Sequence, residues 1–252
     1  MSGIQLILLV AIFFITSVIS VITGSTSLIT VPVMLQFSIE PRTALATNML
    51  ALTFMSVGGT LPFIGKKIID YNRLPIIIFL TVVGSIIGAL LVLVIPSDSM
   101  PAIISVLMIV VAIFSIFNRD AGIISTKKQP SIIIEICGYL ATFLLGVYGG
   151  FFSGGYVTML TVVYVSLFRM TFVQAVANTK FINIFSSLIA TIIFFTQGIV
   201  DYKLGIILSI TMFLGGIVGS QIAFKLNNIG LRRIFITTVI ALAIKTLFDF
   251  LT

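Results

Sequence analysis

The chain has 252 residues, of which 59% are hydrophobic and only 8% are charged. A soluble domain carries about 25% charged residues, so this composition cannot cover a water-facing surface and indicates an integral membrane protein. Soluble enzymes, nucleic-acid-binding modules and secreted disulfide scaffolds are therefore excluded. The 14 Lys and Arg residues are scattered between apolar segments, which favours a topology signal over a nucleic-acid surface. The single cysteine excludes an internal disulfide, and the lack of histidine excludes an ordinary His/Cys metal site.

In chain order, charge, proline and glycine divide the sequence into ten apolar segments. Their limits are 4–22, 25–38, 43–64, 74–95, 100–118, 131–152, 156–168, 172–195, 205–224 and 233–250. About 20 apolar residues are needed to cross a bilayer, so 25–38 and 156–168 are too short. Each of these two follows a short polar or glycine-rich break. We therefore expect 4–38 and 131–168 to be broken or re-entrant helix pairs whose free backbone groups face protein or a wet cavity.

The two halves of the sequence resemble each other at a shift of 131 positions. This shift places Gly24 over Gly155, the pair Asp70-Tyr71 over Asp201-Tyr202, and one Gly-xxx-Gly pair over another, at 84 and 88 and at 215 and 219. We predict two membrane repeats, residues 1–120 and 121–252, each of about five helical segments. The placement of Lys and Arg puts equivalent loops on opposite faces, which predicts an inverted pair. The expected fold is thus an all-α, multi-pass protein of the cytoplasmic membrane that contacts lipid.

The breaks are the first candidate site. The segment 146–155 is rich in glycine, and it precedes a half helix that starts near residue 156. Unpaired backbone N–H groups at such a helix start can bind an anion. Close helix packing is the alternative reason for these glycines, and it is weighed equally for Gly146, Gly149 and Gly150. The candidate residues at the two breaks are Ser25, Thr26, Ser153, Gly154 and Gly155.

The next helix of each half carries polar side chains inside an apolar run. In the first half these are Thr47 and Asn48, and in the second Asn178, Thr179 and Lys180. A buried ammonium is costly, and no acidic residue lies in the same apolar stretch, which argues for an anionic ligand. Snorkelling of the lysine toward the membrane surface is the alternative. The two Gly-xxx-Gly pairs are interpreted as packing faces, either within one chain or between two chains of a homodimer.

These motifs resemble the TauE/SafE sulfite-exporter family over nearly the whole chain. The resemblance lies in the glycine-rich 146–155, in Ala177-Asn178-Thr179-Lys180 and in Gly198-Ile199-Val200-Asp201-Tyr202, whereas the first half has Ser25-Thr26-Ser27 in place of the family's glycines. It implies transport of sulfur-containing anions such as sulfite or small organosulfonates. It also implies an anion site at Gly154, Gly155, Thr179 and Lys180, and symmetry adds Ser25, Thr26, Thr47 and Asn48.

The sequence therefore favours a secondary transporter, an exporter of a small sulfur-containing anion that works by alternating access between the repeats. The alternative is a non-transporting membrane factor for the assembly or maturation of a partner protein. An enzyme is not expected, because no catalytic constellation can be assembled. No cofactor or metal is expected either. The usual proton-relay groups are missing, because there is no histidine and no carboxylate near the middle of a segment.

Overall fold

The computed structural model describes residues 3–24, 26–66, 68–117 and 130–225. All regular secondary structure in these ranges is helical. The α-helices are α1 (Gly3–Thr23), α2 (Ser27–Gln36), α3 (Pro41–Thr60), α4 (Leu74–Val94), α5 (Met100–Phe117), α6 (Ile132–Phe151), α7 (Tyr156–Ser166), α8 (Phe172–Thr196) and α9 (Tyr202–Lys225). Short 3-10 turns follow α3 (Leu61–Phe63) and precede α5 (Ser97–Ser99). The first nine predicted segments are thereby confirmed as helices, and the tenth, 233–250, lies outside the described residues.

Local sequence signals fix where the two central helices begin. The Glu40 side chain accepts a hydrogen bond from the Thr43 backbone N–H at 2.7 Å, and Pro41 occupies the first position of α3. At the start of α8, Thr171 and Gln174 form a reciprocal capping box, in which each side chain accepts from the other residue's backbone N–H. These caps set the register with which the polar residues of α3 and α8 enter the bundle.

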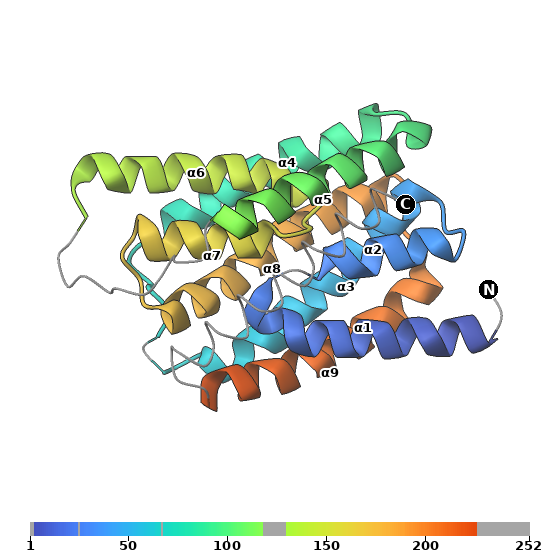
Figure 1. Ribbon diagram of the computed structural model, residues 1–252, viewed down its shortest axis with the longest axis horizontal. Coiled ribbons are helices and arrows are strands. Elements are labelled where there is room, and N and C mark those ends of the chain that lie inside the picture. Colours follow the sequence, from blue (N-terminus) through green and yellow to red (C-terminus); the bar gives the residue numbers. More distant parts are fainter. Residues whose placement is uncertain (1–2, 25, 67, 118–129, 226–252) are drawn as a thin grey trace.

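The helices form an elongated bundle with two distinct ends (Figure 1). We call them the Asp201 end, at the right, where α8 connects to α9, and the Asp70 end, at the left, where α3 connects to α4. Helices α1 and α2 run from the Asp201 end to the middle and back, and α6 and α7 do the same from the Asp70 end. Six described helices, α1, α3, α4, α6, α8 and α9, are long and apolar enough to cross a membrane.

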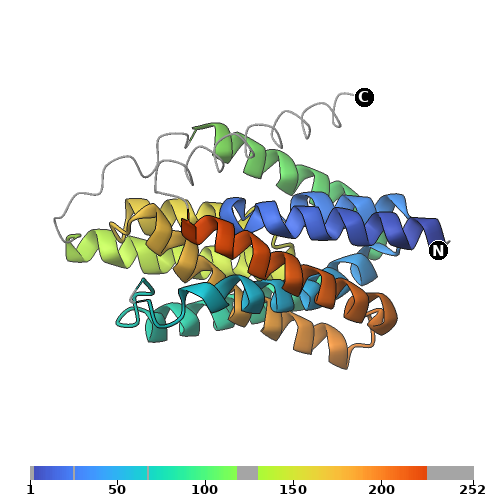
Figure 2. The ribbon, with the colours of Figure 1, turned by 90° about the horizontal axis from the view of Figure 1, so that it is seen from below.

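Helix packing is reciprocal between the two halves. Helix α1 packs on α9, side by side in Figure 2, just as α6 packs on α4. Helix α3 likewise packs on α9 as α8 packs on α4, and α3 and α8 also contact each other. A Cβ on Gly88 of α4 would collide with the Val147 carbonyl of α6, and one on Gly219 of α9 with the Val18 carbonyl of α1. The Gly-xxx-Gly faces are therefore used within the chain.

Candidate functional site

The two helix breaks touch each other in the middle of the bundle. Helix α1 is followed by left-handed Gly24, with a φ of 73°, and α7 starts after left-handed Gly155, with a φ of 75°. The Thr158 hydroxyl, in the first turn of α7, donates to the Thr23 carbonyl of α1 at 2.6 Å. A Cβ on Gly24 would lie 2.6 Å from the Thr158 backbone nitrogen. The C-terminal end of α1 is thus packed against the N-terminal end of α7.

Lys180 joins α8 to this junction. Its side chain is fully buried, with the residue only 1% exposed, and its Nζ donates to the Ser20 carbonyl at 2.8 Å. The same carbonyl also accepts the Gly24 N–H at 2.8 Å. Among the described residues, no carboxylate lies within ion-pair distance of Lys180. The C-terminal end of α1, the negative end of the helix dipole, is therefore the partner that the sequence did not indicate.

Thr179 and Asn48 connect each half helix to the next full helix. The Asn48 side chain accepts from the Thr30 hydroxyl at 2.8 Å and donates to the Ser27 hydroxyl at 2.9 Å, which ties α3 to α2. The Thr179 hydroxyl lies 3.4 Å from that of Thr161, which ties α8 to α7. The two contacts occupy equivalent positions in the two halves, and both lie beside the central junction.

Thr47 and Asn178 face away from the breaks, toward opposite ends of the bundle. The Asp201 N–H donates to the Thr47 hydroxyl at 3.0 Å, and the Asp70 N–H donates to the Asn178 side-chain oxygen at 3.1 Å. Successive residues of an α-helix point about 100° apart, so Asn178, Thr179 and Lys180 leave α8 in different directions. The structure thus groups Lys180 with the breaks and gives Thr47 and Asn178 contacts with end loops.

The remaining candidates at the breaks are buried and closely packed. Thr26 precedes α2, and its hydroxyl lies 3.5 Å from the Met55 sulfur. The Ser153 carbonyl accepts the Tyr156 N–H at 3.1 Å. A Cβ on Gly154 would collide with the Phe152 ring, and one on Gly155 with Val111 of α5. Packing thus accounts for both glycines, and anion binding by this segment stays a prediction. Ser25 lies outside the described residues.

Sequence reasoning missed Ser20 and Thr158 as parts of the junction, whereas it placed Thr23 in the first break. Ser20 contributes a backbone carbonyl, which any residue would supply, and Thr158 is one hydroxyl among many in apolar helices. The repeat could have pointed to Thr158, because it is equivalent to Ser27, the residue that binds Asn48. Asn183, one turn beyond Lys180, donates to the Ser56 hydroxyl at 2.6 Å and so links α8 to α3.

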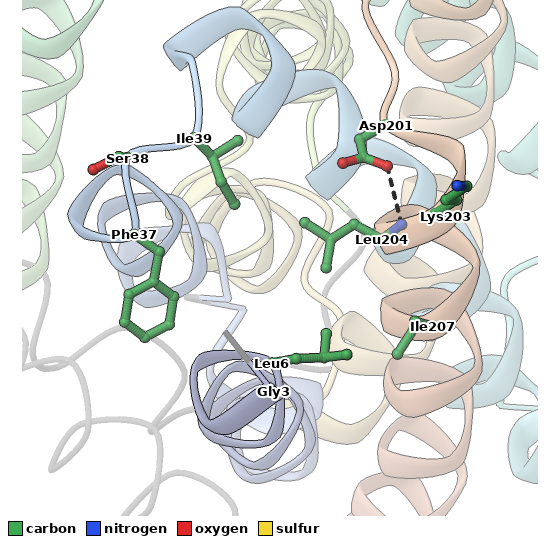
Figure 3. A pocket seen from close by; sticks show the side chains of 9 residues that line it. All are labelled: Gly3, Leu6, Phe37, Ser38, Ile39, Asp201, Lys203, Leu204 and Ile207. Atoms are coloured by element: carbon green, nitrogen blue, oxygen red, sulfur yellow. Dashed lines mark hydrogen bonds between the residues drawn. The ribbon is translucent and has the colours of Figure 1, made fainter. Parts of the chain in front are cut away.

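Each end of the bundle has a pocket near its Asp-containing loop, and the Asp70 end has a second pocket, lined by Gly65, Ile69, Asp70, Tyr71 and Asn72. The Arg169 pocket, at the Asp70 end, has a volume of about 290 Å³ and is lined by Ile68, Ile69, Asp70, Arg73, Phe168, Arg169, Met170 and Gln174. The Lys203 pocket, at the Asp201 end, has a volume of about 380 Å³ (Figure 3). It is lined by Gly3, Leu6, Phe37, Ser38, Ile39, Asp201, Lys203, Leu204 and Ile207.

An ion-pair network closes one side of the Arg169 pocket. Arg73 donates through Nη1 to Asp70 at 2.7 Å and through Nε to Glu135 of α6 at 2.8 Å. Partial burial lowers the pKa of Arg73, but its hydrogen bonds to Glu135 and Asp70 outweigh this and raise the pKa above its ordinary value. The guanidinium also lies over the Phe168 ring, 5.5 Å from its centroid. Arg73 therefore stays charged in a fixed position.

Comparison with known proteins identifies the family of this membrane bundle. A profile described as "Sulfite exporter TauE/SafE" matches residues 9–246, which is nearly the whole chain. The chain belongs to the TauE/SafE family. This TauE/SafE protein is therefore a multi-pass membrane transporter, and the family resemblance read from the breaks and from residues 177–180 is confirmed.

Relatives in other bacteria carry transporter names. The chain is 29% identical over 236 residues to the "Probable membrane transporter protein ORF9" of a Sinorhizobium species, covering 94% of this chain and 90% of that protein. It is 26% identical over 228 residues to "Probable membrane transporter protein YfcA" of Escherichia coli K12, covering 90% and 84%. A Haemophilus influenzae "Probable membrane transporter protein" is 25% identical over 248 residues, covering 98% and 96%. No solved structure matches the TauE/SafE chain significantly.

Proposed function

We propose that this TauE/SafE transporter exports a small sulfur-containing oxyanion, such as sulfite or an organosulfonate, across the cytoplasmic membrane. The observation that carries the proposal is Lys180, a fully buried cation without a carboxylate partner among the described residues, at the junction of two helix breaks. A buried charge is stable only when an opposite charge or dipole compensates it, and the negative C-terminal end of α1 compensates the charge of Lys180 in part. An oxyanion would complete the neutralisation.

The anion would bind where Lys180 meets α1. An ammonium has three N–H donors, and one of them is used on the Ser20 carbonyl. Binding of an oxyanion to the other donors draws charge away from that hydrogen bond, which loosens the hold of α8 on the end of α1. In this way the presence of the anion would be transmitted to the α1–α2 hairpin. The substrate binds and leaves without covalent chemistry, so no enzymatic step is proposed.

Alternating access would come from two inverted repeats, residues 1–120 and 121–252. The starts of α1, α2, α3 and α4 recur at α6, α7, α8 and α9 with a shift close to 131 residues, and the helix contacts between the halves are reciprocal. At the Asp70 end, the described loops and helix ends hold the basic residues Lys66, Arg73, Arg169 and Lys225 and the acidic residues Asp70 and Glu135. This excess of positive charge supports a cytoplasmic Asp70 end.

Sulfite flux through purified protein in liposomes tests the proposal. We expect wild-type protein to move radiolabelled sulfite and Lys180→Met to reduce the initial rate at least 100-fold, because the methionine fills the space without the charge. Lys203→Met, at the surface of the Asp201 end, is the matched control and should keep a rate within twofold of wild type. Normal sulfite flux in Lys180→Met would remove this lysine from the mechanism.

Flux through the wild type also tests the substrate. Liposomes that hold the protein but show no movement of sulfite, taurine or another small sulfonate above that of empty liposomes would contradict the proposed substrate class. Thermal unfolding in detergent provides a check on folding, since a bound anion stabilises the native protein by mass action. Lys180→Met should unfold near the wild-type temperature but lose the stabilisation by sulfite.

A further inference from the structure

Two buried polar side chains of α8, Lys180 and Asn183, are left with unused hydrogen-bonding groups. They lie three residues apart in the helix and so share one of its faces. Lys180 uses one N–H donor on the Ser20 carbonyl, and its ammonium has two more. Asn183, only 3% exposed, donates through Nδ2 to the Ser56 hydroxyl, but its Oδ1 has no hydrogen-bond partner among the described residues. This face of α8 therefore carries spare donors one turn away from an unpaired acceptor.

Both side chains pack against the same stretch of α3. A Cβ on Gly59 would lie 3.8 Å from the Lys180 Cδ, and Ser56, which binds Asn183, lies one turn earlier in α3. The two side chains thus lie over adjacent turns of one neighbouring helix. A buried acceptor without a partner costs free energy, so the protein is stabilised when a donor reaches the Asn183 Oδ1.

The first repeat forms the same helix without these two polar groups. At the shift of 131 residues, Met49 takes the place of Lys180 and Leu52 takes that of Asn183. Both are buried apolar side chains of α3, which packs on α9 as α8 packs on α4. Apolar side chains of similar size therefore satisfy helix packing at these positions, and the ammonium and the amide of the second repeat need another explanation.

We propose that the substrate is a monoanion that carries an O–H group, and that Asn183 accepts this O–H while Lys180 binds an anionic oxygen. Hydrogensulfite, HO–SO₂⁻, has this chemistry. The inference rests on the proposed transport function and names the protonation state of its substrate. Charge balance supports it, because Lys180 is the only charged side chain that is buried in the described part of the chain. It neutralises one negative charge, whereas a sulfite dianion would bury a second one.

The proton then crosses the membrane on the substrate. Hydrogensulfite keeps its own proton, so the protein needs no group that takes one up and releases it. This agrees with a chain that has no histidine and with a described junction in which no carboxylate lies within ion-pair distance of Lys180. Only hydrogen bonds form and break. Each transport event moves one negative charge, which an inside-negative membrane potential drives outward.

Methanesulfinate is the matched ligand for a test, because a methyl group replaces the hydroxyl of hydrogensulfite while the charge stays the same. Isothermal titration calorimetry of the purified full-length protein in detergent would compare the sodium salts of both anions in a mildly acidic buffer, where hydrogensulfite is the main form of sulfite. We expect the wild type to bind hydrogensulfite about tenfold more tightly or better, because the methyl group leaves the Asn183 acceptor unpaired. Equal affinities would overturn the proposal without any substitution.

Asn183→Leu, which copies Leu52 of the first repeat, then tests the residue. It should bring the two affinities within about twofold of each other, by weakening the binding of hydrogensulfite and leaving that of methanesulfinate unchanged. Thr191→Val is the matched control and should keep the wild-type ratio, because the buried Thr191 hydroxyl donates to the Ser187 carbonyl of its own helix, α8. Lys180→Met should weaken both ligands alike. An equal loss of both ligands in Asn183→Leu would overturn the contact between Asn183 and the O–H group.

The pH inside liposomes reports the protonation state of the transported species. Hydrogensulfite that enters a neutral lumen releases protons, whereas the sulfite dianion takes them up, so the two changes in pH have opposite signs. At a clamped membrane potential, we expect a trapped pH-sensitive dye to show acidification that is faster in wild type than in Lys180→Met. Alkalinisation that depends on Lys180 would overturn the proposal, because the dianion would then be the species that crosses.

The failure of this proposal can be told apart from the failure of the transport function. Sulfite flux in liposomes, together with equal binding of hydrogensulfite and methanesulfinate, would refute recognition of the O–H group and leave transport standing. An Asn183-dependent preference for hydrogensulfite in a protein that moves no sulfite would refute the transport proposal and retain the binding mode. Absence of both binding and flux would refute both.

Discussion

At the scale of single residues, Gly24 sits at the most constrained point of the junction. Its left-handed backbone lets the chain turn out of α1 while its N–H still bonds to the Ser20 carbonyl. The backbone of Val157 and Thr158 occupies the space that a side chain would need. Lys180 binds the same Ser20 carbonyl, so the position of Gly24 and the position of the buried cation depend on each other.

Gly24→Ala should therefore destabilise the protein by more than its backbone conformation alone explains. We expect a loss of about 2–4 kcal/mol, from the left-handed conformation and from the collision with α7 together. Gly198→Ala is the matched control, because Gly198 is also left-handed, with a φ of 66°, but has no atom within 4 Å of the added Cβ. It should cost only about 1–2 kcal/mol. Equal losses in the two variants, measured by unfolding in mixed micelles, would contradict the tight junction.

At the scale of helices, glycine sets the distance at which the two halves pack. Gly84 and Gly88 place the backbone of α4 against that of α6, and Gly215 and Gly219 do the same for α9 and α1. In lipid the hydrophobic effect does not drive helices together, so such close backbone contact provides much of their association. Since these faces are occupied within the chain, they offer no stripe for a homodimer, and dimer formation would need another surface.

Gly88→Leu should consequently weaken the folding of one chain, independently of protein concentration. The leucine must push α4 away from α6, and we expect a loss of at least about 3 kcal/mol, above the usual range for overpacking because the opposing atoms are backbone. Gly59→Ala in α3 is the control, because its Cβ would meet its nearest neighbour at an ordinary 3.7 Å. It should be neutral or stabilise slightly, as alanine favours a helix. A melting temperature of Gly88→Leu that rises with protein concentration would instead place this face between chains.

At the scale of the whole molecule, the sequence predicts the order of the helices along the chain but not the direction in which their polar side chains point. Charge, proline and glycine between the apolar runs predicted the nine described α-helices to within a few residues, because these residues interrupt an apolar helix. The polar positions were also found, since each hydroxyl or amide stands out in an apolar run. The orientation of these side chains was not predictable, because it depends on which neighbouring segment each one contacts. Lys180 hydrogen-bonds to α1, whereas Thr47 and Asn178 hydrogen-bond to end loops.

These end-loop contacts form a matched pair across the molecule. The Asp201 N–H bonds to Thr47 of the other half, and the Asp70 N–H bonds to Asn178 of the other half, at equivalent positions. In a carrier that opens alternately, one such bond would hold each end closed. The ion pairs of Arg73 add to closure at the Asp70 end only. If the ends open in this way, the Arg73 ion pairs would make the Asp70 end harder to open.

Removal of the two bonds should shift access in opposite directions. A reporter cysteine at Thr26, in a Cys137→Ser protein, lies buried at the central break. Thr47→Val should speed its labelling by an impermeant thiol reagent added at the Asp201 end, and Asn178→Leu should speed labelling from the Asp70 end. Each buried hydrogen bond contributes about 1 kcal/mol, so each change should be about fivefold. The increase in labelling rate from the Asp70 end should be smaller than that from the Asp201 end, because the Arg73 ion pairs remain, unless Glu135→Gln is added. Faster labelling from the same end in both variants would contradict closure by matched bonds, because a general loosening of the bundle would then explain the effect.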